Sequence, residues 1–418
     1  MIVDENTIRP IVTDEAQDEA QAEARAGTEV IETDVAIIGA GLAGSLARAI
    51  LVRAGYRVAL IDKRVVPPDE FRVEKIGGRQ VDIFRRLGFM ADVEAVASPY
   101  DRVLNIKDGK LVDVSVGRAY GLLYSDLVAM ARGLTPDQDG LLIDQVNNVS
   151  CSNDRQHLTL ASGKRVSSRL VILATGMAGA LAFNLGIKRR MIAPRHSVSF
   201  GFTIARPDNA PFDFEALTCY GERTSDGVDY LSLFPVSSGM RANLFMFRDP
   251  NDPIMRELRR DTRRTLLRLM PGLQSYLGDF QIVGQVQNWV MDLSVAEGHL
   301  QPGIVLIGDA FQTNCPAAGT GVSRLLVDVE RLCTDHVPRW LATSGMSTEK
   351  IAQFYSDHDK LAADRHSLQM ARFRQAMTSN TEAKWHVRRR LHFLRRMITY
   401  RVDRIHPGWV SRLRGALR

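Results

Sequence analysis

The chain has 418 residues, of which 45% are hydrophobic and 24% charged, and its formal net charge is +6. This length allows two domains with sizeable cores, and the composition is that of a globular protein. No apolar run approaches the roughly 18 residues of a membrane-spanning helix, and no basic-then-apolar secretion signal opens the chain. The four cysteines are scattered without metal-like spacing, so we expect no metal site and a cytoplasmic location.

The charge is distributed unevenly along the chain. Residues 1–34 contain ten acidic side chains against two arginines, whereas residues 384–418 contain eleven lysines and arginines against one aspartate. Acidic segments with few large apolar residues do not bury enough surface to fold alone. We therefore expect residues 1–32 to be a disordered acidic leader.

A strand, a glycine-rich turn, a helix and a second strand follow the leader. Asp34–Ile38 is a short apolar run of the kind found in strands buried on both faces. Gly39, Gly41 and Gly44 then form the pattern G-x-G-x-x-G, and Tyr56–Ile61 is the next apolar strand. A glycine pattern between a strand and a helix, with an acidic residue about 20 positions later, is typical of a dinucleotide site.

Each residue of this turn has a separate expected role. The first glycine permits the tight turn, the second lets the backbone approach a pyrophosphate, and the third lets the helix pack on the strand. The helix N-terminus near Leu42 favours the phosphate charge, and Asp62 can accept hydrogen bonds from a ribose diol. The candidate residues are Gly39, Gly41, Leu42, Ala43, Gly44, Asp62 and Lys63.

A second motif about 270 residues later indicates which dinucleotide is bound. The apolar strand Ile304–Ile307 runs into Gly308-Asp309, then a loop rich in proline and glycine, then a helix. This order resembles the second signature of the FAD-dependent p-hydroxybenzoate hydroxylase superfamily. The resemblance covers roughly residues 33–345 and implies that Asp309 binds the ribityl chain of FAD.

The resemblance also implies that the loop before this helix faces the flavin ring. A helix N-terminus would stabilise the negative charge that a reduced flavin carries near N1. We expect Cys315, in the same loop, to be a buried structural thiol. The flavin-facing candidates are Pro316, Gly319, Thr320 and Gly321, and the cofactor-binding candidates here are Gly308, Asp309, Gly321 and Val322.

Three further positions follow from the resemblance. Arg79 or Gln80, at the start of a predicted helix, would reach the FAD phosphate or ribityl chain. A backbone group near Val146, in a predicted strand meander, would touch the adenine. The chain departs from the family at Thr175-Gly176, where aromatic hydroxylases usually have Asp-Gly, so it lacks a residue that in the family engages both FAD and the nicotinamide donor.

The predicted fold class is α/β, with a Rossmann-like FAD-binding domain of a parallel sheet and β-meander crossover, an antiparallel-sheet substrate domain and C-terminal helices. The FAD-binding domain would comprise residues 33–100, 101–188 and 291–345. Residues 189–290 alternate between apolar and polar positions, which predicts the substrate-binding sheet. Residues 346–418 would be helical, and single helices are expected over 253–269 and 349–377.

The resemblance implies a monooxygenase that hydroxylates or epoxidises an apolar aromatic or isoprenoid-like molecule through a flavin C4a-hydroperoxide. NAD(P)H would be the electron donor. Apolar and aromatic residues of the substrate sheet suit a small lipophilic substrate. They are Phe200, Phe202, Tyr220, Tyr230, Phe234, Phe245 and Phe247, and we expect most of them to pack in the core rather than line the pocket.

Two alternatives remain open: a FAD-dependent reductase of isoprenoid double bonds, and a flavin-binding protein without catalysis. The stretch Tyr230–Pro235 is similar to the Y-x-W-x-F-P stretch of geranylgeranyl reductases, with Ser232 in place of tryptophan. Glu74–Gly78 is similar to their E-K-x-C-G-G, with Ile76 in place of cysteine. Flavin halogenases fit less well, because their W-x-W-x-I-P motif is missing.

A basic amphipathic helix is predicted for residues 384–405. Its apolar residues recur at three- and four-residue steps, and arginines occupy most other faces. It could pack on the FAD domain with a solvated basic face, bind anionic lipid together with Trp409 as a peripheral membrane contact, or bind an acidic partner. Nucleic acid is not expected, since no binding module accompanies the charge. The sequence does not define the oligomeric state.

Overall fold

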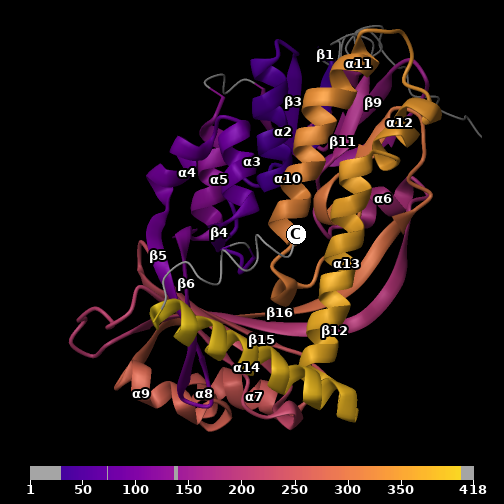
Figure 1. The fold of residues 1–418 in the computed structure, drawn as a ribbon. Helices are drawn as coiled ribbons and strands as arrows, with labels where there is room; N and C mark the ends of the chain where they lie inside the picture. Colours follow the sequence, from indigo (N-terminus) through magenta and orange to yellow (C-terminus); the bar gives the residue numbers. More distant parts are fainter. Residues whose placement is uncertain (1–29, 73, 136–139, 406–418) are drawn as a thin grey trace, which may run out of the picture.

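The computed structural model of the protein describes residues 30–72, 74–135 and 140–405. Three sheets of five, four and eight strands build the molecule, and helices cover them (Figure 1). The architecture is the predicted α/β class with parallel and antiparallel sheets and C-terminal helices. Within the described residues, no helix is both long and apolar enough to cross a membrane.

The five-stranded sheet is parallel and forms the centre of the nucleotide-binding part. Its strand order is β17 (Ile304–Leu306), β11 (Leu170–Leu173), β2 (Val35–Ile38), β3 (Val58–Asp62) and β7 (Leu141–Ile143). Every residue of β2, β3, β11 and β17 is buried, which explains their continuous apolar sequences. Because the strands are parallel, the glycine turns that follow β2 and β17 meet at the same edge.

Different layers cover the two faces of this sheet. Alternate strand residues such as Ile37 and Ile172 pack against helices α2 (Leu42–Arg53), α5 (Tyr124–Gly133) and α10 (Gly321–Arg331). The residues between them, such as Ile38 and Val171, pack against the four-stranded sheet. That sheet has the order β1 (Val30–Glu32), β10 (Arg165–Ser168), β9 (Gln156–Leu160) and β8 (Val146–Ser150).

Strand β1 corrects the predicted boundary of the acidic leader. Val30–Glu32 pairs in parallel with β10, so these three residues belong to the folded part. The remaining leader, residues 1–29, lies outside the described residues.

The eight-stranded sheet is larger than the predicted substrate domain. Its order is β16 (Gln281–Glu297), β12 (Lys188–Ala205), β15 (Gly239–Met246), β14 (Val228–Val236), β13 (Ala216–Tyr220), β5 (Ser98–Lys107), β6 (Lys110–Gly121) and β4 (Lys75–Gly77). The sequence analysis placed β4, β5 and β6 in the FAD-binding domain. They instead extend the substrate sheet, because β5 pairs in parallel with the distant strand β13. Strand β16 also crosses the expected boundary at residue 290.

Two predicted helices are each divided in two. Residues 253–269 form α7 (Pro253–Arg260) and α8 (Thr262–Leu269), because the Asp261 carboxylate accepts a hydrogen bond from the backbone of Arg264 and caps α8. Residues 349–377 belong to α12 (Thr348–Tyr355) and α13 (His358–Ser379), with Asp357 as the cap. Aspartate at these positions satisfies the free amides of a new helix start.

The remaining helices flank these layers. They are α3 (Arg79–Arg86), α4 (Met90–Val96), α6 (Ala180–Asn184), α9 (Gln274–Leu277), α11 (Val337–Leu341) and α14 (Ala383–Ile405). Helix α13 packs along α10, and α14 then lies across the substrate-sheet end of the molecule, beside β6 (Figure 1). The C-terminal region therefore contacts both the nucleotide-binding part and the substrate sheet.

Candidate functional site

The first glycine turn connects β2 to α2 as the spacing predicts. Gly39 has a φ of +104°, a conformation that L side chains rarely adopt. A Cβ on Gly44 would lie 1.9 Å from the carbonyl oxygen of Gly39, so this glycine is required for packing of the helix on the turn. No side chain caps α2 at Gly41, which leaves its first amides directed at the cavity that Gly39, Gly41, Leu42 and Ala43 line.

Asp62, at the end of β3, supports this turn from the adjacent strand. Its Oδ2 accepts a hydrogen bond from the backbone N–H of Ala40 at 2.8 Å. Arg132 of α5 donates to the carbonyl of Ala40 at 2.9 Å and lies 3.8 Å from the same carboxylate. Arg132 lines the cavity but belongs to no motif, so sequence reasoning did not identify it.

The second glycine turn lies at the other side of the same cavity. Gly308, with a φ of +60°, follows β17 and precedes Asp309. The loop then reaches α10, which begins at Gly321 without a side-chain cap. Gly308, Asp309, Pro316, Gly319, Gly321 and Val322 line the cavity. Two turns 270 residues apart are thus brought together at the edge of one parallel sheet.

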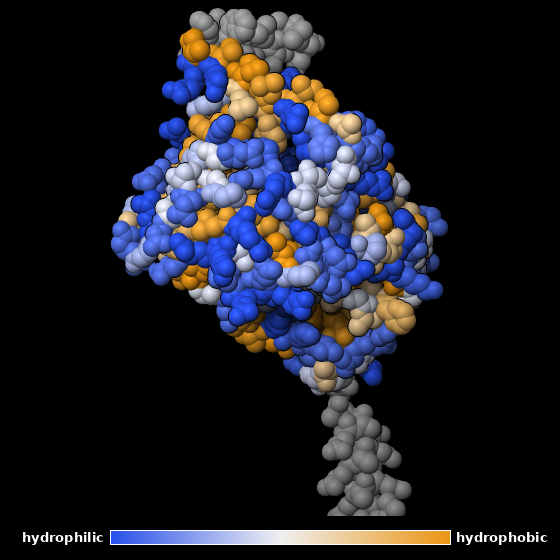
Figure 2. Space-filling view, turned by 90° about the horizontal axis from the view of Figure 1, so that it is seen from below, coloured by the Kyte–Doolittle hydropathy of each residue, from blue (hydrophilic) through white to orange (hydrophobic). Residues whose placement is uncertain are grey.

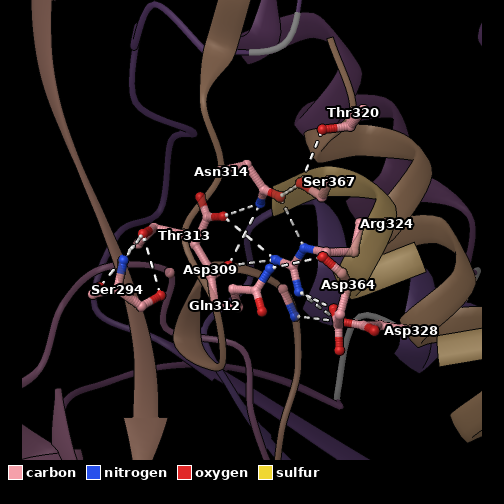
Figure 3. Close-up of polar contacts among 12 residues, drawn as sticks. Ser294, Asp309, Gln312, Thr313, Asn314, Thr320, Arg324, Asp328, Asp364 and Ser367 are labelled. Atoms are coloured by element: carbon pink, nitrogen blue, oxygen red, sulfur yellow. Dashed lines mark hydrogen bonds and ion pairs between the residues drawn. The ribbon is translucent and has the colours of Figure 1, made fainter. Parts of the chain in front are cut away.

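A buried network of charged and polar side chains supports this second turn (Figure 3). Asn314 donates a hydrogen bond to Asp309 Oδ1 at 3.1 Å and accepts one from Arg324 Nε at 3.0 Å. Arg324, which is 1% exposed, also pairs with Asp328 and Asp364. Asp328 in turn accepts a hydrogen bond from the backbone N–H of Gly308 at 2.9 Å. The network therefore connects α10 and α13 to the turn.

One face of the eight-stranded sheet forms the far wall of the cavity, which has a volume of about 470 Å³. Side chains alternate between the two faces of each strand. Phe200 and Phe202 point to the core on the opposite face, as expected for most of these aromatic residues. The cavity-lining residues of this sheet are Lys75, Gly77, Ser199, Tyr230, Ser232, Phe234, Asn243, Phe245, Trp289 and Met291.

Polar groups within this wall are buried. Arg241 and Glu74 form a two-point ion pair, with distances of 2.9 Å from Nε and 2.8 Å from Nη2 to the two carboxylate oxygens. Burial raises the pKa of Glu74, against the opposing effect of Arg241. Ser199 Oγ and Asn243 Oδ1 are buried without a hydrogen-bond partner among the described residues. Unpaired buried polar atoms are costly, and those in a cavity wall can hydrogen-bond to a bound molecule.

Several predicted residues lie elsewhere. The Lys63 and Arg79 side chains are exposed and do not line the cavity, and neither does Val146 of the four-stranded sheet. Gln80 does line it, although its Oε1 accepts a hydrogen bond from the backbone of Gly77. The Thr320 hydroxyl bonds to Ser367 at 2.9 Å and points away into the network (Figure 3).

Arg72 and Tyr124 are cavity residues that sequence reasoning missed. The Arg72 guanidinium lies 3.6 Å from Asp309 Oδ2 and 5.1 Å from the Trp289 ring centre. Burial raises the pKa of Tyr124, whose hydroxyl would lie 3.5 Å from a Cβ on Gly41. Neither side chain belongs to a recognised binding motif, so only the folded chain places them here.

Cys315 lies in the loop before Pro316 and is buried, as predicted. Burial raises the pKa of its thiol to about 11, so the thiol is neutral at pH 7. Within the described residues no group of three or more His, Cys, Asp or Glu side chains is placed to hold a metal ion.

This donor set fits a dinucleotide diphosphate and a flavin. Two helix starts without side-chain caps, at Gly41 and Gly321, direct free amides at opposite parts of one cavity. Carboxylates at Asp62 and Asp309 can accept hydrogen bonds from sugar or ribityl hydroxyls, and nearby arginines balance phosphate charge. The site is that of a dinucleotide-binding flavoprotein fold.

Comparison with known families identifies the class. The model of the FAD binding domain family (FAD_binding_3) matches residues 32–335, and the chain belongs to this family. The resemblance to FAD-dependent monooxygenases of the p-hydroxybenzoate hydroxylase superfamily is thus confirmed, and the cofactor is FAD. The class that the match defines is that of FAD-binding proteins.

Similar sequences match only in part. A 71-residue segment is 39% identical to 2,4-dichlorophenol 6-monooxygenase of Cupriavidus pinatubonensis, covering 17% of this chain and 12% of that protein. Protein FixC of Salmonella typhi is 27% identical over 198 residues, which are 42% of this chain and 44% of FixC. The chain therefore spans less than half the length of these curated relatives.

Solved structures with a similar fold align with almost the whole chain. p-Nitrophenol 4-monooxygenase PnpA from Pseudomonas putida DLL-E4 has a TM-score of 0.72 at 16% identity, covering 90% of this chain and 98% of that one. The flavin-dependent brominase Bmp2 has a TM-score of 0.65 at 18% identity, covering 87% of this chain and 94% of that one. At these low sequence identities, the structural similarity shows that the folds are shared and nothing more.

Proposed function

We propose that this protein is a FAD-dependent monooxygenase that hydroxylates or epoxidises a small, largely apolar aromatic or isoprenoid-like molecule. The observation that supports this proposal is the continuity of one cavity, from the two glycine turns to the aromatic wall of the eight-stranded sheet. When bound, FAD supplies the redox and oxygen-transfer chemistry.

The wall of the cavity supports a lipophilic substrate with a polar group. Tyr230, Phe234, Phe245 and Trp289 offer apolar and aromatic surface. Because the Arg241 guanidinium is already paired with Glu74, it gives no free positive charge to a substrate carboxylate. Ser199 and Asn243 can instead exchange hydrogen bonds with a hydroxyl or amide group, which would orient the molecule.

The chain's own residues also prepare the cavity for chemistry. The amides at the start of α10 can stabilise negative charge that develops on the bound cofactor. The sheet and the Phe71 ring, which lies against Gly201, line the cavity and can exclude water from it. We propose NAD(P)H as electron donor; since Thr175 replaces the family's aspartate, its site must use other residues.

Oxygen uptake tests this function. The purified yellow protein would be mixed with NADH or NADPH and a panel of phenols, indoles and isoprenoids, with oxygen electrode traces and product masses recorded. Substrate-stimulated oxygen uptake with a product 16 Da heavier supports the monooxygenase. A product 2 Da heavier without oxygen uptake would replace it with the reductase alternative, and no turnover with any donor, dithionite included, would favour a binding protein.

An Asn243→Ala variant and a Phe200→Leu control sharpen the test. Both residues belong to the same sheet, but only Asn243 lines the cavity. The proposal expects a higher KM for hydroxylated substrates in Asn243→Ala, with FAD content unchanged. The control should alter stability without this selective effect on KM.

A further inference from the structure

Helix α14 is attached to the body of the protein along one side only. Arg396 donates hydrogen bonds to Asp113 at 2.6 and 2.8 Å and to the Tyr220 hydroxyl at 2.8 Å. The ring of Phe393 lies 5.0 Å from that of Tyr220, and Arg389 donates to two backbone carbonyls at the end of α13. At 100° per residue these three side chains point in nearly the same direction from the helix axis.

The opposite side of α14 carries an apolar stripe that no described part of the chain covers. Its most exposed members are between 47% and 71% exposed. Because the residues recur at three-, four- and seven-residue steps, they form one line along the helix, about 27 Å long at 1.5 Å per residue. The stripe consists of Val387, Leu391, Leu394, Ile398 and Ile405.

Basic residues border this stripe on both sides. Arg390 and Arg401 follow one edge, and Lys384, Arg388 and Arg395 follow the other, as the 100° step requires. All five are exposed, and no acidic side chain of the described residues pairs with Arg390, Arg395 or Arg401. Seen from below, this end of the molecule has patches of apolar surface between hydrophilic side chains (Figure 2).

We infer that α14 binds the surface of a membrane containing anionic lipid, with its axis in the plane of the membrane. The apolar stripe would enter the boundary between headgroups and acyl chains, while the two basic borders would lie at the level of the phosphates. This arrangement requires an exposed apolar line with positive charge on both sides, and α14 provides both. The C-terminal Trp409, which the sequence analysis also assigned to this contact, lies outside the described residues.

Charge favours a lipid surface over a second copy of the chain. Two α14 helices packed through their stripes would bring the bordering arginines of one helix against those of the other. Like charges at close range oppose association, whereas anionic headgroups neutralise each basic residue. The location of α14 beside the substrate sheet also suits an enzyme whose substrate is lipophilic, although the membrane contact does not depend on that function.

Vesicle sedimentation of the full-length protein tests the inference. We expect the protein to pellet with vesicles of phosphatidylcholine and phosphatidylserine, and to remain in the supernatant with phosphatidylcholine alone. Arg390→Glu, Arg395→Glu and Arg401→Glu together should weaken binding on the order of 100-fold, since each basic residue near the surface contributes about fivefold. The double substitution Leu391→Asp and Ile398→Asp should abolish binding, because the apolar stripe could no longer enter the membrane.

A matched control separates a specific contact from general positive charge. Arg165→Glu, Lys188→Glu and Arg365→Glu change the net charge equally at exposed positions away from α14. The control should bind as the wild type does, and FAD absorbance should be equal in all variants. The inference is overturned if the control loses binding as much as the α14 variants, if the wild type does not bind, or if analytical ultracentrifugation shows a dimer that Leu391→Asp dissociates.

Discussion

Arg324 Nε lies 3.0 Å from Asn314 Oδ1, which joins a fully buried charge on α10 to the loop that faces the candidate flavin site (Figure 3). The same asparagine donates to Asp309, so a single amide connects the second glycine turn to the helix behind it. The site is therefore supported from beneath by Arg324, which does not itself line the cavity.

Replacing Arg324 should destabilise the whole protein. Arg324→Met would leave Asp328 and Asp364 with Lys360 as their one remaining buried cation among the described residues. Breaking a buried ion pair from one side costs about 3 to 5 kcal/mol. Urea unfolding should show this loss. Arg365→Met, at an exposed position of α13, should change the free energy of unfolding by less than about 0.5 kcal/mol, and an equal effect would contradict the role of the network.

The two glycines of the first turn should respond differently to substitution. Gly44→Ala places a Cβ 1.9 Å from a backbone oxygen, so we expect a loss of stability of about 3 kcal/mol. A Cβ at Gly41 meets only the Tyr124 hydroxyl, at an ordinary 3.5 Å. Gly41→Val should therefore fold yet be colourless, since its side chain occupies the approach of the pyrophosphate. Visible absorbance and thermal unfolding together separate the two effects, and a yellow Gly41→Val protein would refute this assignment.

Asp309 is expected to be required for FAD retention. Asp309→Ala removes the acceptor predicted for the ribityl chain and should give colourless protein, whereas Asp309→Asn keeps an acceptor oxygen and should retain part of the flavin. Equilibrium dialysis against FAD measures both affinities. Equal affinity in the wild type and Asp309→Ala would show that this carboxylate only pairs with Arg72 and Asn314.

Stability should fall in mild acid because of His196. Burial lowers the pKa of His196 to about 4, from about 6.5 in an unfolded chain. Between these values the unfolded chain binds a proton that the folded protein does not, so stability is present above pH 6.5 and decreases as the pH falls towards 4. The loss should reach at most about 3 kcal/mol. Urea unfolding at pH 7 and 4.5 should show that the free energy of unfolding falls less in His196→Gln than in the wild type. An identical fall in both proteins would assign the acid sensitivity to other groups.

Local patterns in the sequence determined the two glycine turns, the parallel strands before them and the class of cofactor. These features depend on neighbours within a few residues: only glycine fits the φ of Gly39, and only a helix start presents free amides at Gly41 or Gly321. The three- and four-residue spacing of apolar residues likewise predicted the basic amphipathic helix near the C-terminus.

Tertiary structure alone decided which side chains surround the cavity. Alternation revealed that the substrate sheet has two faces, but both are largely buried, so the sequence could not tell the core face with Phe200 from the cavity face with Phe245. Arg72 and Arg132 reach the site, and β5 joins β13, only because distant segments pack together. Contacts of this kind depend on which distant segments pack together in the folded chain, and no local residue pattern carries that information.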